Sequence, residues 1–250
     1  MQRFELLGSP MDSASMEETV ETIRSGIENH RFIQHVVVNA AKLVQMRIDP
    51  LLRASVHACD LINIDGMGVV FAARWLGHPV AHRIAGIDLF HALVQMSAQQ
   101  GFPIFLLGAE PAIVATVANR LQAQHPGLRI AGYHHGYFWS DEKAMVNSIR
   151  ASGAKLLFVA ITSPKKENFI NRWREQLGVQ FVMGVGGTFD VVAGKVARAP
   201  RWMQTAGLEW LFRALQEPGR LGRRYLLTNW QFAGLVLRAK WAQRRADTGQ

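Results

Sequence analysis

The chain has 250 residues, of which 49% are apolar and 19% are charged, so it can form one large globular domain or two small ones. Its one cysteine, Cys59, excludes an internal disulfide and a cysteine-based zinc cluster. No uninterrupted apolar run approaches the roughly 18 residues of a membrane span. The first ten residues, Met1–Pro10, lack the pattern of a signal peptide.

Most of the positive charge lies near the C-terminus. Residues 195–250 contain 11 Lys and Arg against 3 Asp and Glu, whereas residues 1–194 contain 17 against 16. Four of the seven tryptophans also lie in this last part: Trp202, Trp210, Trp230 and Trp241. A basic segment of this kind can meet nucleic acid, an anionic membrane or an acidic ligand.

Apolar periodicity predicts strands that alternate with helices up to residue 190. In chain order we expect a helix over Met11–Asn29, a strand over Val36–Asn39, helices over Ala40–Met46 and Pro50–Ala58, a strand over Leu61–Ile64, a helix over Gly86–Gln100, a strand over Pro103–Gly108, a helix over Pro111–Gln124, a strand over Arg129–Tyr133, a helix over Asp141–Ser152, a strand over Lys155–Ile161, a helix from Ser163 to Leu177, and a strand over Val179–Val185. After Asp190 the pattern is helical only, to Arg245.

The predicted strands are short, continuous apolar runs rather than alternating ones. Such runs are typical of a mostly parallel sheet covered by helices on both faces. We therefore predict an α/β, Rossmann-like body over residues 1–194 and a helical C-terminal appendage over residues 195–250.

One stretch places a carboxylate directly after a strand. The apolar run Leu61–Ile64 ends in Asp65-Gly66, and apolar residues follow at helix spacing from Val69 to Leu76. Asp65 would then lie at the carboxyl end of a strand, where open α/β sheets bind their ligands. Alternatively, Asp65 only caps the following helix.

Other predicted strands also end in polar residues or glycine. If the sheet is parallel, these ends meet at one edge, and their glycine backbone suits a diphosphate. We expect the segments His134–Phe138 and Gly186–Asp190 to line a nucleotide pocket, with Asp190 either accepting a hydrogen bond from ribose or uracil or capping a helix. The residues predicted to bind substrate at these ends are Gly108, His135, Gly136, Gly186, Gly187, Thr188 and Asp190.

Several familiar motifs are absent from the chain. There is no Gly-x-Gly-x-x-Gly or Walker pattern, no His-Glu-x-x-His and no Asp-x-Asp. A metal-free way of neutralising phosphate charge is therefore favoured, and arginine does this through bidentate contacts.

Taken together, the motifs resemble the TagA/WecG/CpsF glycosyltransferases of bacterial cell-surface polysaccharide synthesis. The resemblance extends over residues 34 to 225. It rests on Asn39-Ala40, Asp65-Gly66-Met67-Gly68-Val69-Val70, Arg83-Ile84-Ala85-Gly86, Phe105-Leu106-Leu107-Gly108, His135-Gly136-Tyr137-Phe138, Ser163-Pro164-Lys165, Gly184-Val185-Gly186-Gly187-Thr188-Phe189-Asp190, Arg198-Ala199-Pro200, Leu208-Glu209-Trp210, and Glu217-Pro218 with Arg220.

The resemblance implies an inverting, metal-independent transferase without a cofactor. The donor would be a UDP-sugar, typically of N-acetylmannosamine or a uronic acid, and the acceptor a sugar linked to undecaprenyl diphosphate. Asp65 would be the general base and Asn39 would help to position it. Arg83 and the arginines of the appendage, Arg213, Arg220 and Arg223, would meet the diphosphate. The resemblance also implies a cytoplasmic protein that is peripheral on the inner face of the bacterial plasma membrane, and it leaves open whether the chain forms a homo-oligomer.

Two positions depart from the family pattern. Val37 stands where the family often has threonine, and Lys166 stands in Pro164-Lys165-Lys166-Glu167 where the family commonly has glutamine. Because the glutamine belongs to the family's active site, Lys166 is a candidate substrate contact. A cation there would suit a uronate donor or a charged acceptor, and a neutral replacement is the alternative.

The basic appendage allows three interpretations. Leucines and tryptophans alternate with arginines in a way that suits helices lying on an anionic membrane, and a pair of core-packing helices with a basic outer face is the alternative. A nucleic-acid-binding protein is a third interpretation, although no recognised nucleic-acid module is present. For the whole chain, a nucleotide-dependent oxidoreductase is the other enzyme class, which the missing glycine fingerprint disfavours.

Overall fold

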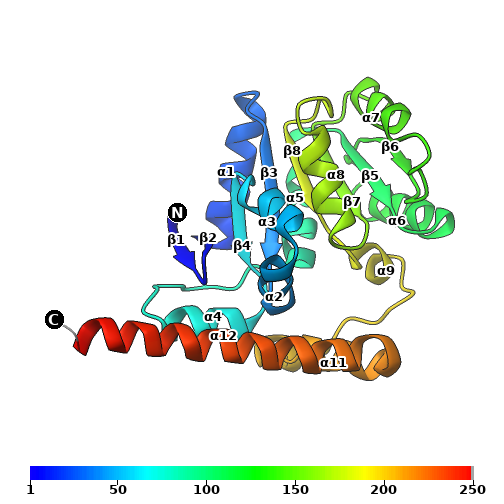
Figure 1. Cartoon of the computed structure of the whole chain (residues 1–250). Helices are drawn as coiled ribbons and strands as arrows, with labels where there is room; N and C mark the ends of the chain where they lie inside the picture. The colour runs from blue at the N-terminus through cyan, green and yellow to red at the C-terminus, as the bar shows by residue number, and fades with distance from the viewer. Residues whose placement is uncertain (249–250) are drawn as a thin grey trace.

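The protein is described by a computed structural model (Figure 1) that covers residues 1–248, without the side chains of Arg220, Leu221, Arg223, Arg224 and residues 246–248. Its strands are β1 (Gln2–Leu6), β2 (Ser9–Ser13), β3 (Ile33–Val38), β4 (Leu61–Ile64), β5 (Ile104–Gly108), β6 (Ile130–His134), β7 (Leu156–Ala160) and β8 (Phe181–Gly184). Its helices are α1 (Met16–Glu28), α2 (Ala40–Ile48), α3 (Pro50–His57), α4 (Met67–Trp75), α5 (Gly86–Gln100), α6 (Pro111–Gln124), α7 (Glu142–Ala151), α8 (Lys165–Trp173), α9 (Thr188–Val192), α10 (Arg201–Thr205), α11 (Glu209–Gln216), the short η1 (Pro218–Gly222) and α12 (Arg223–Thr248).

The eight strands form one sheet in the order β1-β2-β4-β3-β8-β7-β5-β6. All neighbouring pairs are parallel except β1 and β2. Successive strand residues enter opposite core layers: Phe158 packs with α1, α5 and α6, whereas Leu157 and Val159 pack with α7 and α8. The prediction of a mostly parallel α/β sheet with helices on both faces is therefore confirmed.

The N-terminal part of the chain differs from the prediction. The helix expected from Met11 begins only at Met16, because residues 9–13 pair with β1 as a hairpin. Asp12 is consequently a buried strand residue whose carboxylate binds Arg3, and the helix is capped by Ser15. The hairpin turn uses Leu7 and Gly8, both with positive φ. Because leucine is not a typical residue for such a position, the sequence did not predict the turn.

Two neighbouring strands of the sheet send the chain in opposite directions. After β3 the chain enters α2, whose Leu43 belongs to one core layer, and after β8 it enters α9, whose Phe189 belongs to the other. The carboxyl ends of β3 and β8 are therefore separated by an open crevice, the place where parallel α/β sheets bind ligands.

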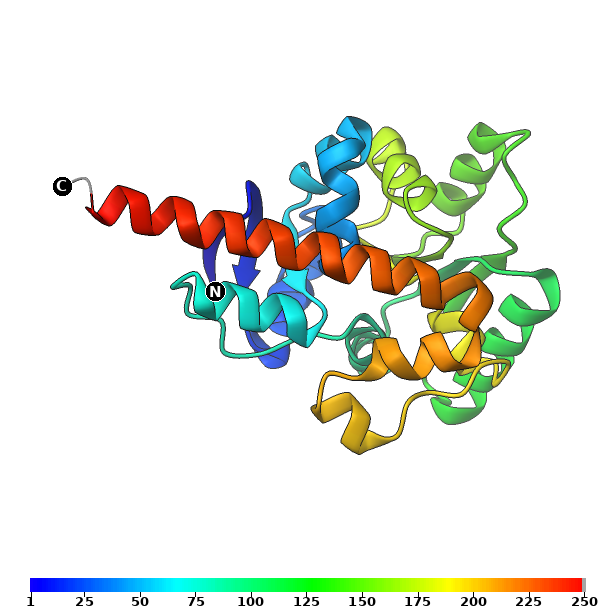
Figure 2. The same cartoon turned by 60° about the horizontal axis from the view of Figure 1, so that its bottom comes forward.

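The last helix, α12, runs along the side of the molecule where α2 and α4 lie, and α10 and α11 lie beside it (Figure 2). Phe232 and Val236 of α12 are buried in the core layer that contains α2 and α4. The expected helical appendage is thus present, whereas the boundary between residues 194 and 195 stays a prediction. None of the helices within residues 1–248 is long and apolar enough to cross a membrane.

A buried group of three charges links α2 to α8. The carboxylate oxygen Oε1 of Glu167 lies 2.7 Å from the Nζ of Lys42 and 2.8 Å from the Nζ of Lys166. The two ammonium groups lower the pKa of Glu167 to about 2, although burial opposes this, while burial lowers the pKa of Lys166 to about 8. Glu167 therefore remains ionised at neutral pH and compensates two buried cations.

Replacing Glu167 with glutamine should destabilise the fold, because it leaves buried ammonium groups without a counter-charge. We expect the free energy of unfolding to fall by about 3–5 kcal/mol, measured by urea denaturation at pH 7. In the parent protein this stabilisation should be present above the unfolded pKa of a glutamate and lost as the pH falls toward 2. The exposed pair of Glu21 and Arg24 is the control, since Glu21→Gln should change the free energy of unfolding far less than Glu167→Gln does. Equal effects of the two substitutions would contradict the account.

Candidate functional site

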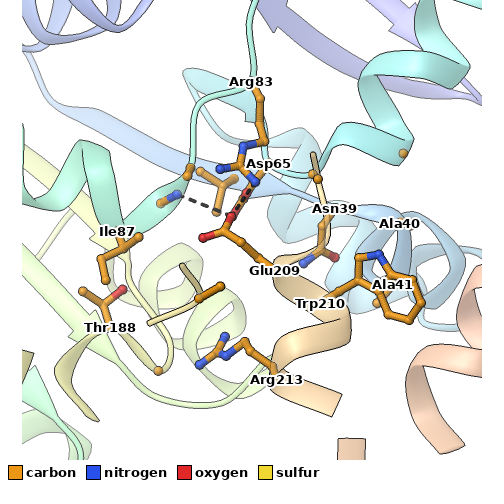
Figure 3. A pocket seen from close by; sticks show the side chains of 18 of the residues that line it. Asn39, Ala40, Ala41, Asp65, Arg83, Ile87, Thr188, Glu209, Trp210 and Arg213 are labelled. Atoms are coloured by element: carbon orange, nitrogen blue, oxygen red, sulfur yellow. Dashed lines mark hydrogen bonds and ion pairs between the residues drawn. The ribbon is translucent and has the colours of Figure 1, made fainter. Parts of the chain in front are cut away.

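A cavity of about 260 Å³ lies where β3, β4 and β8 end. Its walls come from the segments that follow these strands, from the start of α5, and from α11 and α12. The C-terminal segment therefore contributes directly to a pocket that the parallel sheet opens. Figure 3 shows side chains from both parts of the chain pointing into it.

Asp65 lies at the end of β4, in the wall of this pocket. The chain turns at Gly66, whose φ of +119° favours glycine, and Gly66 rather than Asp65 precedes α4. The carboxylate of Asp65 makes no capping bond to α4, so the alternative of a helix cap is wrong. Its Oδ2 instead accepts a long hydrogen bond of 3.4 Å from the backbone N–H of Gly86.

The environment of Asp65 raises the pKa of its carboxyl group. Burial is the main cause, and the negative charge of Glu209 adds to it. The positive charges of Arg83 and Lys42 and the Gly86 N–H oppose the shift without cancelling it. A carboxylate with a raised pKa and few hydrogen bonds is suited to accept a proton, and such groups concentrate at functional sites.

Asn39 also lies in the pocket, directly after β3. Its side-chain oxygen accepts a 3.0 Å hydrogen bond from the backbone N–H of Lys42 and thereby caps α2. A Cβ added at Gly66 would lie 3.8 Å from the Cβ of Asn39, so Asn39 is next to the turn that carries Asp65. The structure thus brings the predicted base and its predicted positioning residue together.

Three arginines among the described side chains line the pocket, and they differ in their partners. Arg83 forms an ion pair with Glu209, and Arg198 forms one of 2.7 Å with Asp88 and a longer one of 3.6 Å with Glu209. Arg213 has no ion-pair partner among the described residues. A Cβ added at Gly187 would lie 2.7 Å from the nearest guanidinium nitrogen of Arg213, so this charge rests against the backbone that follows β8.

The other predicted site residues fall into two groups. Gly187 and Thr188 line the pocket, Gly186 directly precedes them, and the Oδ2 of Asp190 would lie 3.9 Å from a Cβ at Gly187. The second group lies outside the pocket lining and consists of Gly108, His135, Gly136 and Lys166.

The residues outside the pocket lining have local roles in the structure. A Cβ at Gly108 would meet the carbonyl oxygen of Ala160 at 2.4 Å, so the packing of β5 on β7 explains this glycine. His135 accepts a 3.2 Å hydrogen bond from the Tyr137 N–H within its own turn. The buried chain of Lys166 passes beneath Gly184, where an added Cβ would lie 2.7 Å from its Cε.

Two predicted residues, Arg220 and Arg223, lie outside the part of the chain whose side chains are described. Conversely, the sequence predicted no site role for five polar or aromatic residues of the pocket lining: Arg198, Glu209, Trp210, Tyr225 and Asn229. The motifs around Arg198 and Glu209-Trp210 were visible in the sequence, but nothing local indicated that they fold back onto β3 and β4.

Within residues 1–248, no group of three or more His, Cys, Asp or Glu side chains is arranged to hold a metal ion. In a comparison with protein families, the model of the glycosyl transferase WecG/TagA/CpsF family matches residues 4–246. The matched range includes part of β1, all the other strands, the pocket lining and most of α12.

The raised pKa of Asp65 means that its ionised form costs stability in the folded protein. This cost is absent below the unfolded pKa and develops as the pH rises through the folded pKa. Asp65→Asn should therefore raise the melting temperature at pH 8 by about 2–4 °C, measured by calorimetry, with a smaller difference at pH 4. The exposed Glu5, changed to glutamine, serves as the control and should leave the melting temperature unchanged. A lower melting temperature of Asp65→Asn at pH 8 would show that the ionised group supports the fold.

Proposed function

Because this chain belongs to the glycosyl transferase WecG/TagA/CpsF family, we propose that it moves a sugar from a UDP-sugar to a sugar linked to undecaprenyl diphosphate. The transfer would be inverting and metal-independent, and would serve cell-surface polysaccharide synthesis. The observation that carries the proposal is Asp65, a carboxylate with a raised pKa in a pocket that also contains arginines. Family membership favours this activity over nucleic-acid binding and over hydride transfer.

In the proposed reaction the acceptor hydroxyl attacks the anomeric carbon of the donor in one displacement. Asp65 accepts the proton of that hydroxyl as the new bond forms, and the bond to UDP breaks on the opposite side. The raised pKa makes Asp65 a better base than an exposed aspartate, which is ionised but weakly basic. Asn39, held by its cap on α2, would keep the turn at Gly66 in place.

The departing UDP needs positive charge beside it. Arg213 supports this role because it is without an ion-pair partner among the described residues and touches the backbone at Gly187. Arginine can hold two phosphate oxygens at once, and stabilisation of developing charge is usually a large part of catalysis. Arg83 lies in the same pocket, but its charge is shared with Glu209.

The outer face of α12 supports membrane association. Leu226, Trp230, Leu237 and Trp241 recur at helix spacing on one side, and all four are exposed, with Trp230 82% and Trp241 62% accessible. The opposite side, with Phe232 and Val236, is buried. An exposed apolar stripe with tryptophans and nearby basic residues is typical of a helix that lies in a membrane interface. We propose that it holds the protein at the anionic inner leaflet, where its lipid-linked acceptor resides.

Asp65→Asn should reduce the turnover number by roughly 100-fold to 10,000-fold and leave UDP affinity nearly intact. The amide has almost the same shape but cannot accept the proton. Turnover is measured with UDP-sugars and a short-chain lipid-diphosphate-sugar acceptor in the presence of EDTA, and UDP affinity by calorimetry. Near-normal turnover of the variant would remove Asp65 from the mechanism.

Changing Trp230 and Trp241 together to serine should weaken binding to anionic vesicles by roughly tenfold or more, because the apolar contact with the interface is lost. Binding of the full chain is measured by co-sedimentation. Point changes are preferable to truncation, since removing α12 would uncover the core around Phe232. Tyr133→Ser, at an exposed aromatic residue on β6, is the control and should bind as the parent does. Unchanged binding of the double variant would rule out the stripe as the anchor.

A further inference from the structure

Glu209 is an acidic residue in a pocket that is expected to bind a polyanion. It is the first residue of α11, where a negative charge is favoured by the helix dipole. Its carboxylate accepts a hydrogen bond from the Nη1 of Arg83, and both side chains are largely buried, with 21% of Glu209 and 13% of Arg83 exposed. An acidic group beside a predicted diphosphate site calls for a reason other than substrate binding.

Arg83 has two carboxylates within its reach. In Figure 3 the guanidinium of Arg83 points toward Glu209, and Asp65 lies close to both. Arg83 pairs with Glu209 and forms no ion pair with Asp65 among the described residues. Among the described residues, Asp65 accepts only the long hydrogen bond from Gly86, so its oxygens remain available to a ligand.

The choice of partner matters for the chemistry of Asp65. A guanidinium that closed onto Asp65 would stabilise the ionised form and lower its pKa by about one to three pH units. Asp65 would then be a weaker base, and its oxygens would be occupied. The charged groups acting on Asp65 are Arg83 from the loop between α4 and α5, Glu209 from α11 and Lys42 from α2. Of these, Arg83 is the group that Glu209 holds.

We propose that Glu209 is a positioning residue: it holds the guanidinium of Arg83 so that the carboxylate of Asp65 stays free to accept the proton of an incoming hydroxyl. Because Glu209 lies in the C-terminal segment and Asp65 in the sheet, the base is complete only when that segment is docked on the body. This inference rests on the proposed function, in which Asp65 is the base.

The network around Glu209 offers a matched control. Arg198 pairs with Asp88 of α5 as well as with Glu209. Asp88→Asn therefore removes an ion pair between the body and the C-terminal segment without removing a partner of Arg83. If Glu209 only connected the two parts of the chain, Glu209→Gln and Asp88→Asn would have similar effects on activity and on the titration of Asp65. If Glu209 positions Arg83, only Glu209→Gln changes the titration of Asp65.

The first measurement is the pH dependence of kcat/KM, whose acid limb reports the base in the free enzyme. We expect the acid limb of Glu209→Gln to move about one pH unit toward acid, with kcat reduced roughly tenfold. Asp88→Asn should keep the parent's profile. Glu209→Asp, which keeps the charge on a shorter side chain, should lie between the parent and Glu209→Gln.

The second measurement does not depend on turnover. Carboxyl carbon-13 NMR gives the pKa of Asp65 directly, with its signal identified by its loss in Asp65→Asn. We expect a lower pKa of Asp65 in Glu209→Gln, and a much smaller decrease from Glu209→Gln when Arg83 is already glutamine, because only the direct effect of the Glu209 charge then remains. An equal decrease with and without Arg83 would show that the charge of Glu209 acts directly on Asp65, which would overturn the positioning role.

Other results separate the inference from the proposed function. If Glu209→Gln is as inactive as Asp65→Asn while the pKa of Asp65 is unchanged, Glu209 itself takes the proton and the inference is wrong. Similar losses of activity in Glu209→Gln and Asp88→Asn, with an unchanged titration of Asp65, would mean that Glu209 only connects the two parts of the chain. That result also overturns the inference. If Asp65→Asn remains active, the proposed base fails, while the NMR titration still decides whether Glu209 controls Arg83.

Discussion

The structure depends on a carboxylate that is partly buried at the end of a parallel strand. β4 ends just before Asp65, because Gly66 adopts a backbone conformation that directs the chain into α4. Among the described residues, the side chain of Asp65 accepts one long hydrogen bond, from the Gly86 N–H, and the nearby Arg83 is paired with Glu209. Such a site stores unfavourable free energy, which the apolar layers on both faces of the sheet must offset.

The arginines around this carboxylate differ in whether they already have an ion-pair partner. Arg83 and Arg198 are neutralised by Glu209 and Asp88, whereas Arg213 faces the pocket without an ion-pair partner among the described residues. An incoming anion would therefore meet Arg213 at the lowest desolvation cost, because no protein ion pair must first be broken. In the same way, the buried Lys166 is committed to Glu167 beneath Gly184, which limits its availability for direct contact with a donor sugar.

The sequence predicted those features that depend on local pattern. Leu61–Ile64, Gly86–Gln100 and Pro111–Gln124 are found with the expected bounds, because a buried strand or an amphipathic helix has its own periodicity. The hairpin that replaces the start of the expected N-terminal helix was missed, since its turn uses Leu7 in a conformation that leucine seldom adopts.

The part of the candidate site that the strand ends provide was predictable from the sequence, whereas the part that the C-terminal helices provide was not. Strand-end residues such as Asn39 and Asp65 do meet, because parallel strands bring their carboxyl ends to one edge. Glu209 and Tyr225 could not be placed in the same way. Their approach to Asp65 depends on how α11 and α12 fold back across more than a hundred residues of chain, and no local periodicity encodes that return.

The last helix links this pocket to an outward surface. α12 contributes Tyr225 and Asn229 to the pocket, buries Phe232 on one side, and exposes Trp230 and Trp241 on the other. Its 26 residues form one rigid element about 39 Å long. A bilayer that received the exposed stripe would therefore hold the helix that also lines the pocket. Binding to the surface and closure of the pocket would then stabilise the same position of α12, so that each favours the other.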